Sequence, residues 1–130
     1  MPEKINDSAT IAIVEDNEDN MLLLRVLLQK RFRLLEYFDG ETAVPGILST
    51  QPDIVLMDIS LPGISGIETL HQIRLATTAS MPIVALTAHA MVGDRERFLA
   101  EGFDYYISKP ILGLKQLLEP IESLLAKKTA

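Results

Sequence analysis

The chain has 130 residues, of which 48% are hydrophobic and 23% charged, which suffices for one globular domain and not for two. Its 12 lysines and arginines against 18 aspartates and glutamates give a net charge of −6, which argues against a direct nucleic-acid partner. The sequence has no cysteine, which excludes disulfides and thiolate metal sites and favours the cytoplasm. No window approaches the roughly 20 apolar residues of a membrane span, and the N-terminus resembles no secretory signal, so no membrane partner is expected.

The beginning of the chain differs in composition from the rest. Residues 1–8 are polar and aperiodic, which predicts an N-terminal tail before a single domain over residues 9–128. Within that domain, apolar runs of strand length recur at residues 10–14, 32–38, 53–58, 81–87 and 105–108. The segments between these runs are long enough for helices, so five strands are expected to alternate with five helices.

The apolar runs at 53–58 and 81–87 are continuous rather than alternating, as in IVLM and IVAL. Strands that helices cover on both faces have this pattern, and such strands belong to parallel sheets. The sequence therefore predicts a doubly wound α/β fold. The run at 32–38 contains Arg33 and Glu36, which places the second strand at an edge of the sheet.

Two prolines fall inside predicted helices, and several methionines fall in apolar stretches. Pro45 falls in the second predicted helix, where it is tolerated if it lies in the first turn, and Pro120 falls inside the last helix, where a kink or irregular turn is expected. Leucines at helical spacing mark the buried faces of the first and last helices. The methionines in apolar stretches are interpreted as core residues: Met21, Met57, Met81 and Met91.

Polar side chains stand at the carboxyl ends of four predicted strands. In an open parallel sheet, ligands bind at this edge, because loops converge there and helix N-termini direct their free N–H groups at it. Three acids, two hydroxyls and an ammonium are therefore expected at one edge of the sheet. The residues at these strand ends are Glu15, Asp16, Asp58, Thr87, Ser108 and Lys109.

Carboxylates packed a few ångströms apart repel one another unless a cation lies among them, and oxygen-only ligands suit Mg²⁺. The three acids therefore predict a divalent metal. A carboxylate beside such a metal, with a lysine and a hydroxyl nearby, can attack a phosphoryl group while the positive charges hold its oxygens. The expected product is an aspartyl phosphate.

Four segments of the sequence, IAIVEDN, IVLMDISLPGISG, IVALTA and DYYISKP, follow one another at the ends of four predicted strands. In order and spacing they resemble the signature segments of response-regulator receiver domains, and the resemblance extends over about residues 9–127. It implies a five-stranded parallel sheet in the flavodoxin-like order 2-1-3-4-5 with five helices. It also implies a switch in two-component or phosphorelay signalling rather than an enzyme with turnover, with at most weak intrinsic autophosphorylation and autodephosphorylation.

The resemblance assigns roles to the acidic residues. Asp58 corresponds to the phosphoacceptor and Asp16 to the acid that binds Mg²⁺ directly. Glu15 corresponds to its neighbour, which often acts through water, and the carbonyl of Ser60 to the third protein ligand of the metal. Many members have Asp at the position of Glu15, and the longer side chain is expected to shift the water shell of the metal without abolishing binding.

The same resemblance covers the other strand ends. Thr87 corresponds to the hydroxyl that turns toward the phosphoryl group, Lys109 to the lysine that pairs with it, and Tyr106 to the switch aromatic. Ala88 is small, as access to the phosphoryl group requires. The Lys109–Pro110 bond is expected to be cis, a form that costs little only before proline.

The implied partners are a histidine kinase or histidine phosphotransfer protein as donor, and a downstream protein that contacts the fourth helix, fifth strand and fifth helix. If the chain is complete, it acts through protein contacts alone, as a stand-alone receiver. The segment from Thr87 onward resembles receivers of multistep phosphorelays and stand-alone cell-cycle regulators.

Structural interpretations of single residues remain open. Asp16 and the polar residues after it could cap and charge a helix N-terminus, and Asp58 could begin a turn. Thr87 suits a strand by propensity, Lys109 could be a surface lysine, and Tyr106 a partly buried aromatic with its hydroxyl in water. His71 is expected at the surface and His89 at the site rim or in an exposed loop, and neither has the spacing of a metal ligand.

Three other functions compete with the switch as interpretations of the sequence. A phosphohydrolase of the haloacid dehalogenase type would carry its nucleophile after the first strand, in D-x-D, whereas Asp58 follows the third. A flavodoxin-like cofactor binder would need a phosphate loop where this chain has the acidic VEDNED. A receiver that has lost phosphorylation and serves as a docking module would not need the complete residue set.

Overall fold

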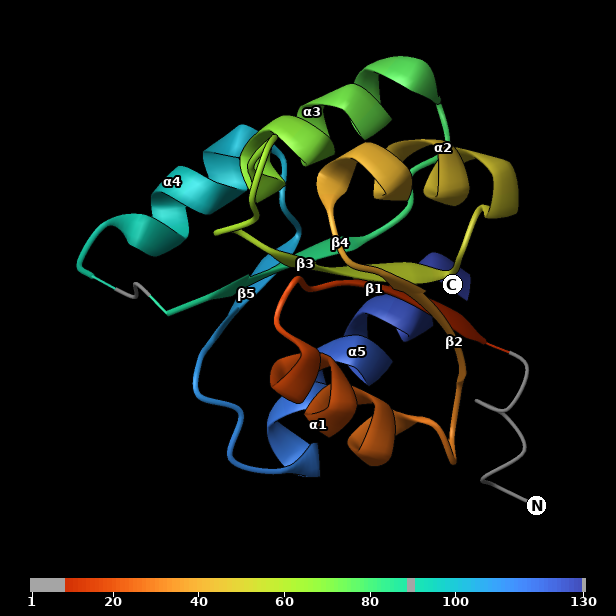
Figure 1. Cartoon of the computed structure of the whole chain (residues 1–130), viewed down its shortest axis with the longest axis vertical. Coiled ribbons are helices and arrows are strands. Elements are labelled where there is room, and N and C mark those ends of the chain that lie inside the picture. The colour runs from red at the N-terminus through yellow and green to blue at the C-terminus, as the bar shows by residue number, and fades with distance from the viewer. Residues whose placement is uncertain (1–8, 89–90, 130) are drawn as a thin grey trace.

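This computed structural model describes residues 9–88 and 91–129, so the expected tail at residues 1–8 and His89 lie outside the described residues. Strands and helices alternate along the chain (Figure 1). In chain order they are β1 (Thr10–Val14), α1 (Glu18–Leu28), β2 (Arg33–Tyr37), α2 (Gly40–Thr50), β3 (Ile54–Asp58), α3 (Gly66–Ala76), β4 (Ile83–Thr87), α4 (Asp94–Glu101), β5 (Tyr105–Ser108) and α5 (Leu114–Thr129).

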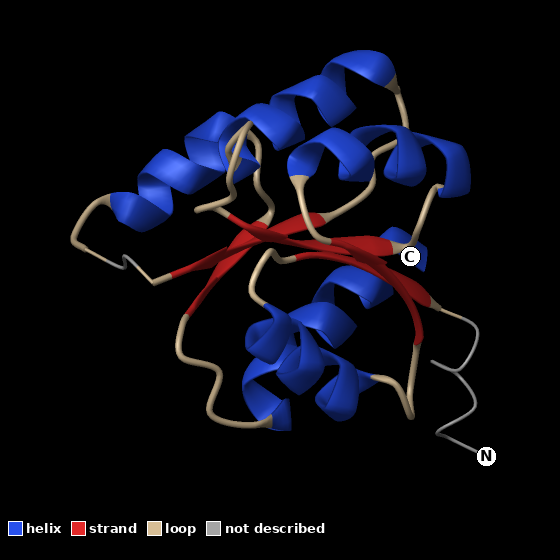
Figure 2. Ribbon diagram, viewed as in Figure 1, coloured by secondary structure: helices blue, strands red, loops and turns tan. Residues whose placement is uncertain are grey.

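The five strands form one parallel sheet in the order β2-β1-β3-β4-β5. Helices α2, α3 and α4 cover one face, and α1 and α5 cover the other (Figures 1 and 2). The predicted doubly wound fold, its strand order and the edge position of β2 are therefore confirmed. No helix in the described part of the chain combines the length and apolar character that crossing a membrane requires.

The core consists of two apolar layers, one on each face of the sheet. Val55 and Met57 of β3 point to the layer under α2, α3 and α4, whereas Ile54 and Leu56 point to the layer under α1 and α5. Every residue of β3 and β4 is buried. Burial on both faces explains why these two strands are continuously apolar in the sequence.

Three strands are shorter than the apolar runs that predicted them. β2, β3 and β4 begin after Phe32, Asp53 and Pro82, respectively. Phe32 is buried without belonging to the ladder, the carboxylate of Asp53 accepts a hydrogen bond from the amide of Thr10 at 2.8 Å, and Pro82 has no N–H to donate. Burial therefore extends beyond the strand at Phe32 and Pro82, whereas Asp53 is half-buried.

Pro45 and Pro120 both lie inside helices of the structure. Asp39 caps α2, accepting a hydrogen bond from the amide of Thr42 at 2.8 Å, so the helix begins early and Pro45 lies beyond its first turn. The condition stated for Pro45, a place in the first turn, is therefore not met, and the helix contains the proline in its interior. α5 continues through Pro120 as one helix, with Leu117 and Ile121 buried on either side, and the expected kink stays a prediction.

Burial of the methionines and leucines also corrects part of the sequence interpretation. Met21, Met57 and Met81 are buried as predicted, whereas Met91 is 75% exposed because it lies in the segment before α4 rather than in a packed element. On α1 the buried face consists of Met21, Leu24 and Leu28. Leu23, one of the leucines of the predicted stripe, is 38% exposed.

Candidate functional site

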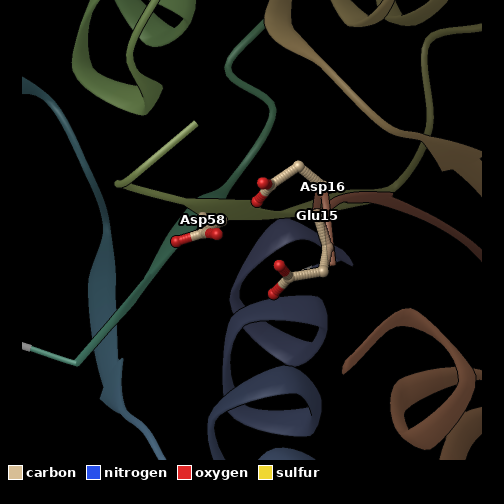
Figure 3. Close-up of side chains that lie close together, drawn as sticks. All are labelled: Glu15, Asp16 and Asp58. Carbon is tan, nitrogen blue, oxygen red and sulfur yellow. The ribbon is translucent and has the colours of Figure 1, made fainter. Parts of the chain in front are cut away.

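The structure brings three acidic side chains together at the carboxyl edge of the sheet. Glu15 and Asp16 directly follow β1 and Asp58 ends β3, and these two strands pair in parallel. Each residue offers one carboxylate oxygen, and the three oxygens lie within 4.8 Å of one another (Figure 3). Glu15 and Asp58 are buried and Asp16 is exposed. A cluster with one open side can receive an ion from solvent.

Burial makes this cluster electrostatically costly. Burial, aided by the charge of Asp58 and opposed by the hydrogen bond from Lys109, raises the pKa of Glu15 above its ordinary value. The amide of Asn17 donates to Glu15 Oε2 at 3.2 Å, and the amide of Ser60 donates to Asp58 Oδ1 at 3.1 Å. The donor set consists of hard carboxylate oxygens gathered on one point, which fits Mg²⁺.

Lys109, just after β5, supplies the positive charge of the site. Its amide donates to the carbonyl of Thr87 at 2.8 Å, which places the residue beside the end of β4. Its ammonium donates to Glu15 Oε1 at 2.9 Å and lies 3.4 Å from Asp58 Oδ2. Burial acts to lower the pKa of Lys109, but the hydrogen bond and charge of Glu15 with the charge of Asp58 outweigh it and raise that pKa.

The predicted cis bond is present between Lys109 and Pro110. Thr87 ends β4 opposite Ser108 of β5, and its side chain is buried. The register that pairs Asp58 with Leu86 puts Thr87 one position beyond the phosphoacceptor candidate at the same edge. Thr87, Lys109 and the acids therefore share the edge that the sequence predicted.

Tyr106 lies away from the acids, in the layer next to α4. It pairs with Ala85 in the sheet, and its half-buried ring lies 6.2 Å from Phe98 and 6.3 Å from Tyr105, centroid to centroid. The ring packs against the buried cluster on the α2–α4 face of the sheet. The structure thus places this residue between the site edge and helix α4 rather than in the site.

The structure settles the capping role considered for Asp16 and locates His71. Asn17, not Asp16, caps α1, because its side chain accepts a hydrogen bond from the amide of Asn20 at 2.9 Å. Asp16 is therefore left free of the capping role. His71 lies on α3, and its Nε2 is 2.8 Å from Glu101 Oε1 of α4, so it is a surface residue with a partner.

Sequence reasoning missed the residues that fix the loop after Asp58. Gly66, the first residue of α3, approaches the carbonyl of Asp58 so closely that a side chain there would collide with it. Glu41 of α2 accepts a hydrogen bond from the amide of Ile64 at 3.1 Å. The glycine belongs to a segment that the resemblance covered, but no sequence pattern marks the contact of Glu41.

A cavity of about 480 Å³ adjoins the site on the side of α1. Glu15 and Lys109 form part of its wall, and Leu23, Ala88 and Pro110 contribute apolar surface. Leu22 and Val26 of α1 are about half exposed beside Leu23. The site is therefore flanked by an open apolar surface.

Comparison with known proteins gives a consistent family. The family model described as response regulator receiver domain matches residues 11–122. Over 118 residues, the chain is 38% identical to the polar-differentiation response regulator DivK of Brucella anthropi, covering 89% of this chain and 95% of DivK. It is 37% identical over 126 residues to the hybrid signal transduction histidine kinase I of Dictyostelium discoideum, covering 90% of this chain and 7% of that much longer kinase.

Solved structures agree with the sequence relatives. The receiver domain of the sensor histidine kinase PA1611 of Pseudomonas aeruginosa, which has a magnesium ion coordinated in its active-site cleft, superposes with a TM-score of 0.83 at 32% identity and covers 92% of this chain and 98% of its own. A two-component response regulator from Clostridium difficile has a TM-score of 0.85 at 24% identity, covering 95% of this chain and 100% of its own, and shows the shared fold.

Proposed function

Because this chain belongs to the response regulator receiver domain family, we propose that Asp58 accepts a phosphoryl group from a phosphohistidine of a histidine kinase or a histidine phosphotransfer protein. A receiver of this family is a signalling switch rather than a classical enzyme. The observation that supports the proposal is the cluster of Glu15, Asp16 and Asp58, whose carboxylate oxygens lie within 4.8 Å of one another.

Asp16, Asp58 and the carbonyl of Ser60 would hold Mg²⁺, with Glu15 acting through water. The ion, when bound, offsets negative charge on the carboxylates and on the incoming phosphoryl oxygens. The solved receiver domain that contains magnesium is 32% identical to this chain, and the oxygen-only donor set here has the chemistry that this ion prefers.

In the transfer, a carboxylate oxygen of Asp58 attacks phosphorus. The new O–P bond forms as the P–N bond to the donor imidazole breaks, and the bonding electrons return to the histidine nitrogen. The ammonium of Lys109, 3.4 Å from Asp58 Oδ2, is placed to pair with a phosphoryl oxygen. Ala88 would leave room for the group, and the hydroxyl of Thr87, which follows the register partner of Asp58, would turn toward it.

The transferred phosphoryl group would change the surface formed by α4, β5 and α5. As Thr87 turns toward the phosphoryl oxygens, it leaves space for Tyr106 to move inward from its contact with Phe98. The surface of α4, β5 and α5 then differs between the two states, and a downstream protein distinguishes them there. The donor protein would dock on the apolar surface of α1 beside the cavity.

Intact mass spectrometry after incubation with acetyl phosphate tests the proposal. We expect the wild type to gain the mass of one phosphoryl group with Mg²⁺, and to gain none with a chelator or in Asp58→Asn. An equal gain in Asp58→Asn would contradict the assignment of the acceptor. Continuous hydrolysis of p-nitrophenyl phosphate by the wild type would instead favour a phosphohydrolase.

A further inference from the structure

The loop between β3 and α3, residues 59–65, follows the phosphoacceptor candidate and carries Ser60. At its start, the amide of Ser60 donates to Asp58 Oδ1 at 3.1 Å. At its end, the amide of Gly66 donates to the carbonyl of Ile59 at 3.0 Å. Both ends of the loop are thus fixed by contacts local to β3 and α3.

The middle of this loop is held by a residue of another helix. Glu41, in the first turn of α2, accepts a hydrogen bond from the amide of Ile64 at 3.1 Å, across 23 positions of sequence. The same carboxylate lies against Gly63, whose φ of +69° suits glycine, and any Cβ at Gly63 would collide with it. Glu41 therefore contacts two consecutive loop residues.

Close packing of α2 against α3 brings Glu41 to this position. Gly40, the residue before it, lies so near Thr69 and Ile64 that a side chain at Gly40 would collide with both. Thr69 is itself buried, and its hydroxyl donates to the carbonyl of Ser65 at 2.7 Å. The backbone at Gly40 and Glu41 is therefore held close to both α3 and the loop residue Ile64.

We propose that Glu41 is a positioning residue for Mg²⁺ binding, which fixes the loop through the amide of Ile64 so that the Ser60 carbonyl faces the acidic cluster. This inference rests on the proposed function, which assigns that carbonyl to the metal. Groups that orient metal ligands without touching the ion contribute about 10- to 100-fold to affinity. Glu41 acts one contact further away, so a smaller effect is expected.

Three variants separate the hydrogen bond from the negative charge. Glu41→Ala removes both, Glu41→Gln keeps an acceptor for the Ile64 amide without the charge, and Glu68→Ala removes an exposed charge from the first turn of α3, beside the same loop. Calorimetric titration with Mg²⁺ gives the affinities. Amide hydrogen exchange of Ile64 in the metal-free proteins gives a second readout that requires no metal.

We expect Glu41→Ala to weaken Mg²⁺ binding by about 3- to 10-fold and to speed exchange of the Ile64 amide, with Glu41→Gln and Glu68→Ala within about twofold of wild type on both measurements. Equal weakening in Glu41→Ala and Glu41→Gln, or in Glu41→Ala and Glu68→Ala, would overturn the inference in favour of a general charge effect. Unchanged exchange and affinity in Glu41→Ala would overturn it outright. A wild type that binds no Mg²⁺ would defeat the proposed function first, and this inference with it.

Discussion

The ammonium of Lys109 is hydrogen-bonded to Glu15 Oε1 at 2.9 Å and lies farther, at 3.4 Å, from Asp58 Oδ2. Without a phosphoryl group, Lys109 thus offsets mainly the negative charge of Glu15. Its proposed role in the phosphorylated protein is to pair with a phosphoryl group on Asp58. A bound cation would compete with Lys109 for the same carboxylates. Mg²⁺ is therefore expected to stabilise the fold more when Lys109 is absent than when it is present.

This competition predicts the behaviour of Lys109→Ala. Removal of the ammonium leaves the buried carboxylates of Glu15 and Asp58 facing each other, so the metal-free protein should lose about 1–3 kcal/mol of unfolding free energy at neutral pH. Mg²⁺ should restore more stability to this variant than to wild type. Thermal melts with and without Mg²⁺ measure both effects, and Lys30→Ala, at an exposed lysine, is the control. An unchanged metal-free stability would contradict the role given to the pair.

Mg²⁺ binding should stabilise the fold, and this stabilisation should depend on Asp16, the exposed residue of the acidic cluster. At a Mg²⁺ concentration about 100 times the dissociation constant, the wild type should gain about 2.7 kcal/mol of unfolding free energy. Asp16→Asn should lose most of this gain, whereas Asp19→Asn, at another exposed acid in the first turn of α1, should keep it. Urea titrations with and without Mg²⁺ provide the measurement. A full gain in Asp16→Asn would exclude Asp16 as a ligand.

The close approach of α3 to Asp58 predicts a difference between two glycines. In Gly66→Ala the new methyl group meets the carbonyl of Asp58, so we expect a loss of about 1–3 kcal/mol of unfolding free energy and weaker Mg²⁺ binding. In Gly113→Ala the methyl group meets no described atom within 4 Å, and the change should stay within about 0.5 kcal/mol. Denaturant unfolding of the two variants side by side tests this, and equal losses would contradict it.

The ion pair between α1 and β2 predicts an acid-dependent stability. Arg25 donates two hydrogen bonds to Glu36, at 2.6 and 2.7 Å, and the hydrogen bond with Arg25 holds the pKa of Glu36 below its ordinary value of 4.5. A depressed carboxyl pKa stabilises the fold above the unfolded value, and this stabilisation disappears as the pH falls through the folded value. Glu36→Gln should therefore melt a few degrees below wild type at pH 7.

The difference in melting temperature between wild type and Glu36→Gln should shrink as the pH falls below 4.5 and vanish once the pH lies below the lowered pKa of Glu36 in the folded protein. Melting curves from pH 7 downward measure it. High salt should shrink the difference at pH 7, because both side chains are partly exposed. A difference that keeps its full size in acid would contradict the assignment of this stability to the charge of Glu36.

The sheet was predictable because its chemistry is local. β3 and β4 are apolar up to their last residues, Asp58 and Thr87, since both faces are covered, and turn-forming residues separate the elements. The grouping of Asp16, Asp58 and Lys109 followed from topology, because carboxyl ends of neighbouring parallel strands meet at one edge. Side-chain identity at a strand end therefore sufficed to anticipate the site.

Features that depend on distant packing were not predictable. The contact of Glu41 with Ile64 requires the positions of two helices, and nothing in the first turn of α2 distinguishes Glu41 from other surface acids. The start of the second helix was not predicted from the sequence, so whether Pro45 fell in its first turn stayed undecided, and the cap at Asp39 begins the helix at Gly40. Met91 was assigned to the core by its apolar neighbours, although no element packs that segment inward.

Reductive trapping of the phosphorylated protein tests most directly whether Asp58 is the acceptor. Borohydride converts an aspartyl phosphate to homoserine, and tandem mass spectrometry of the tryptic peptides then locates the modified position. Residues 34–74 contain Asp58, and residues 5–25 contain Glu15 and Asp16. The account predicts Mg²⁺-dependent conversion of Asp58 and of no other residue in the chain. Conversion at Glu15, Asp16 or any other carboxylate, or a phosphoryl group that survives borohydride, would contradict it.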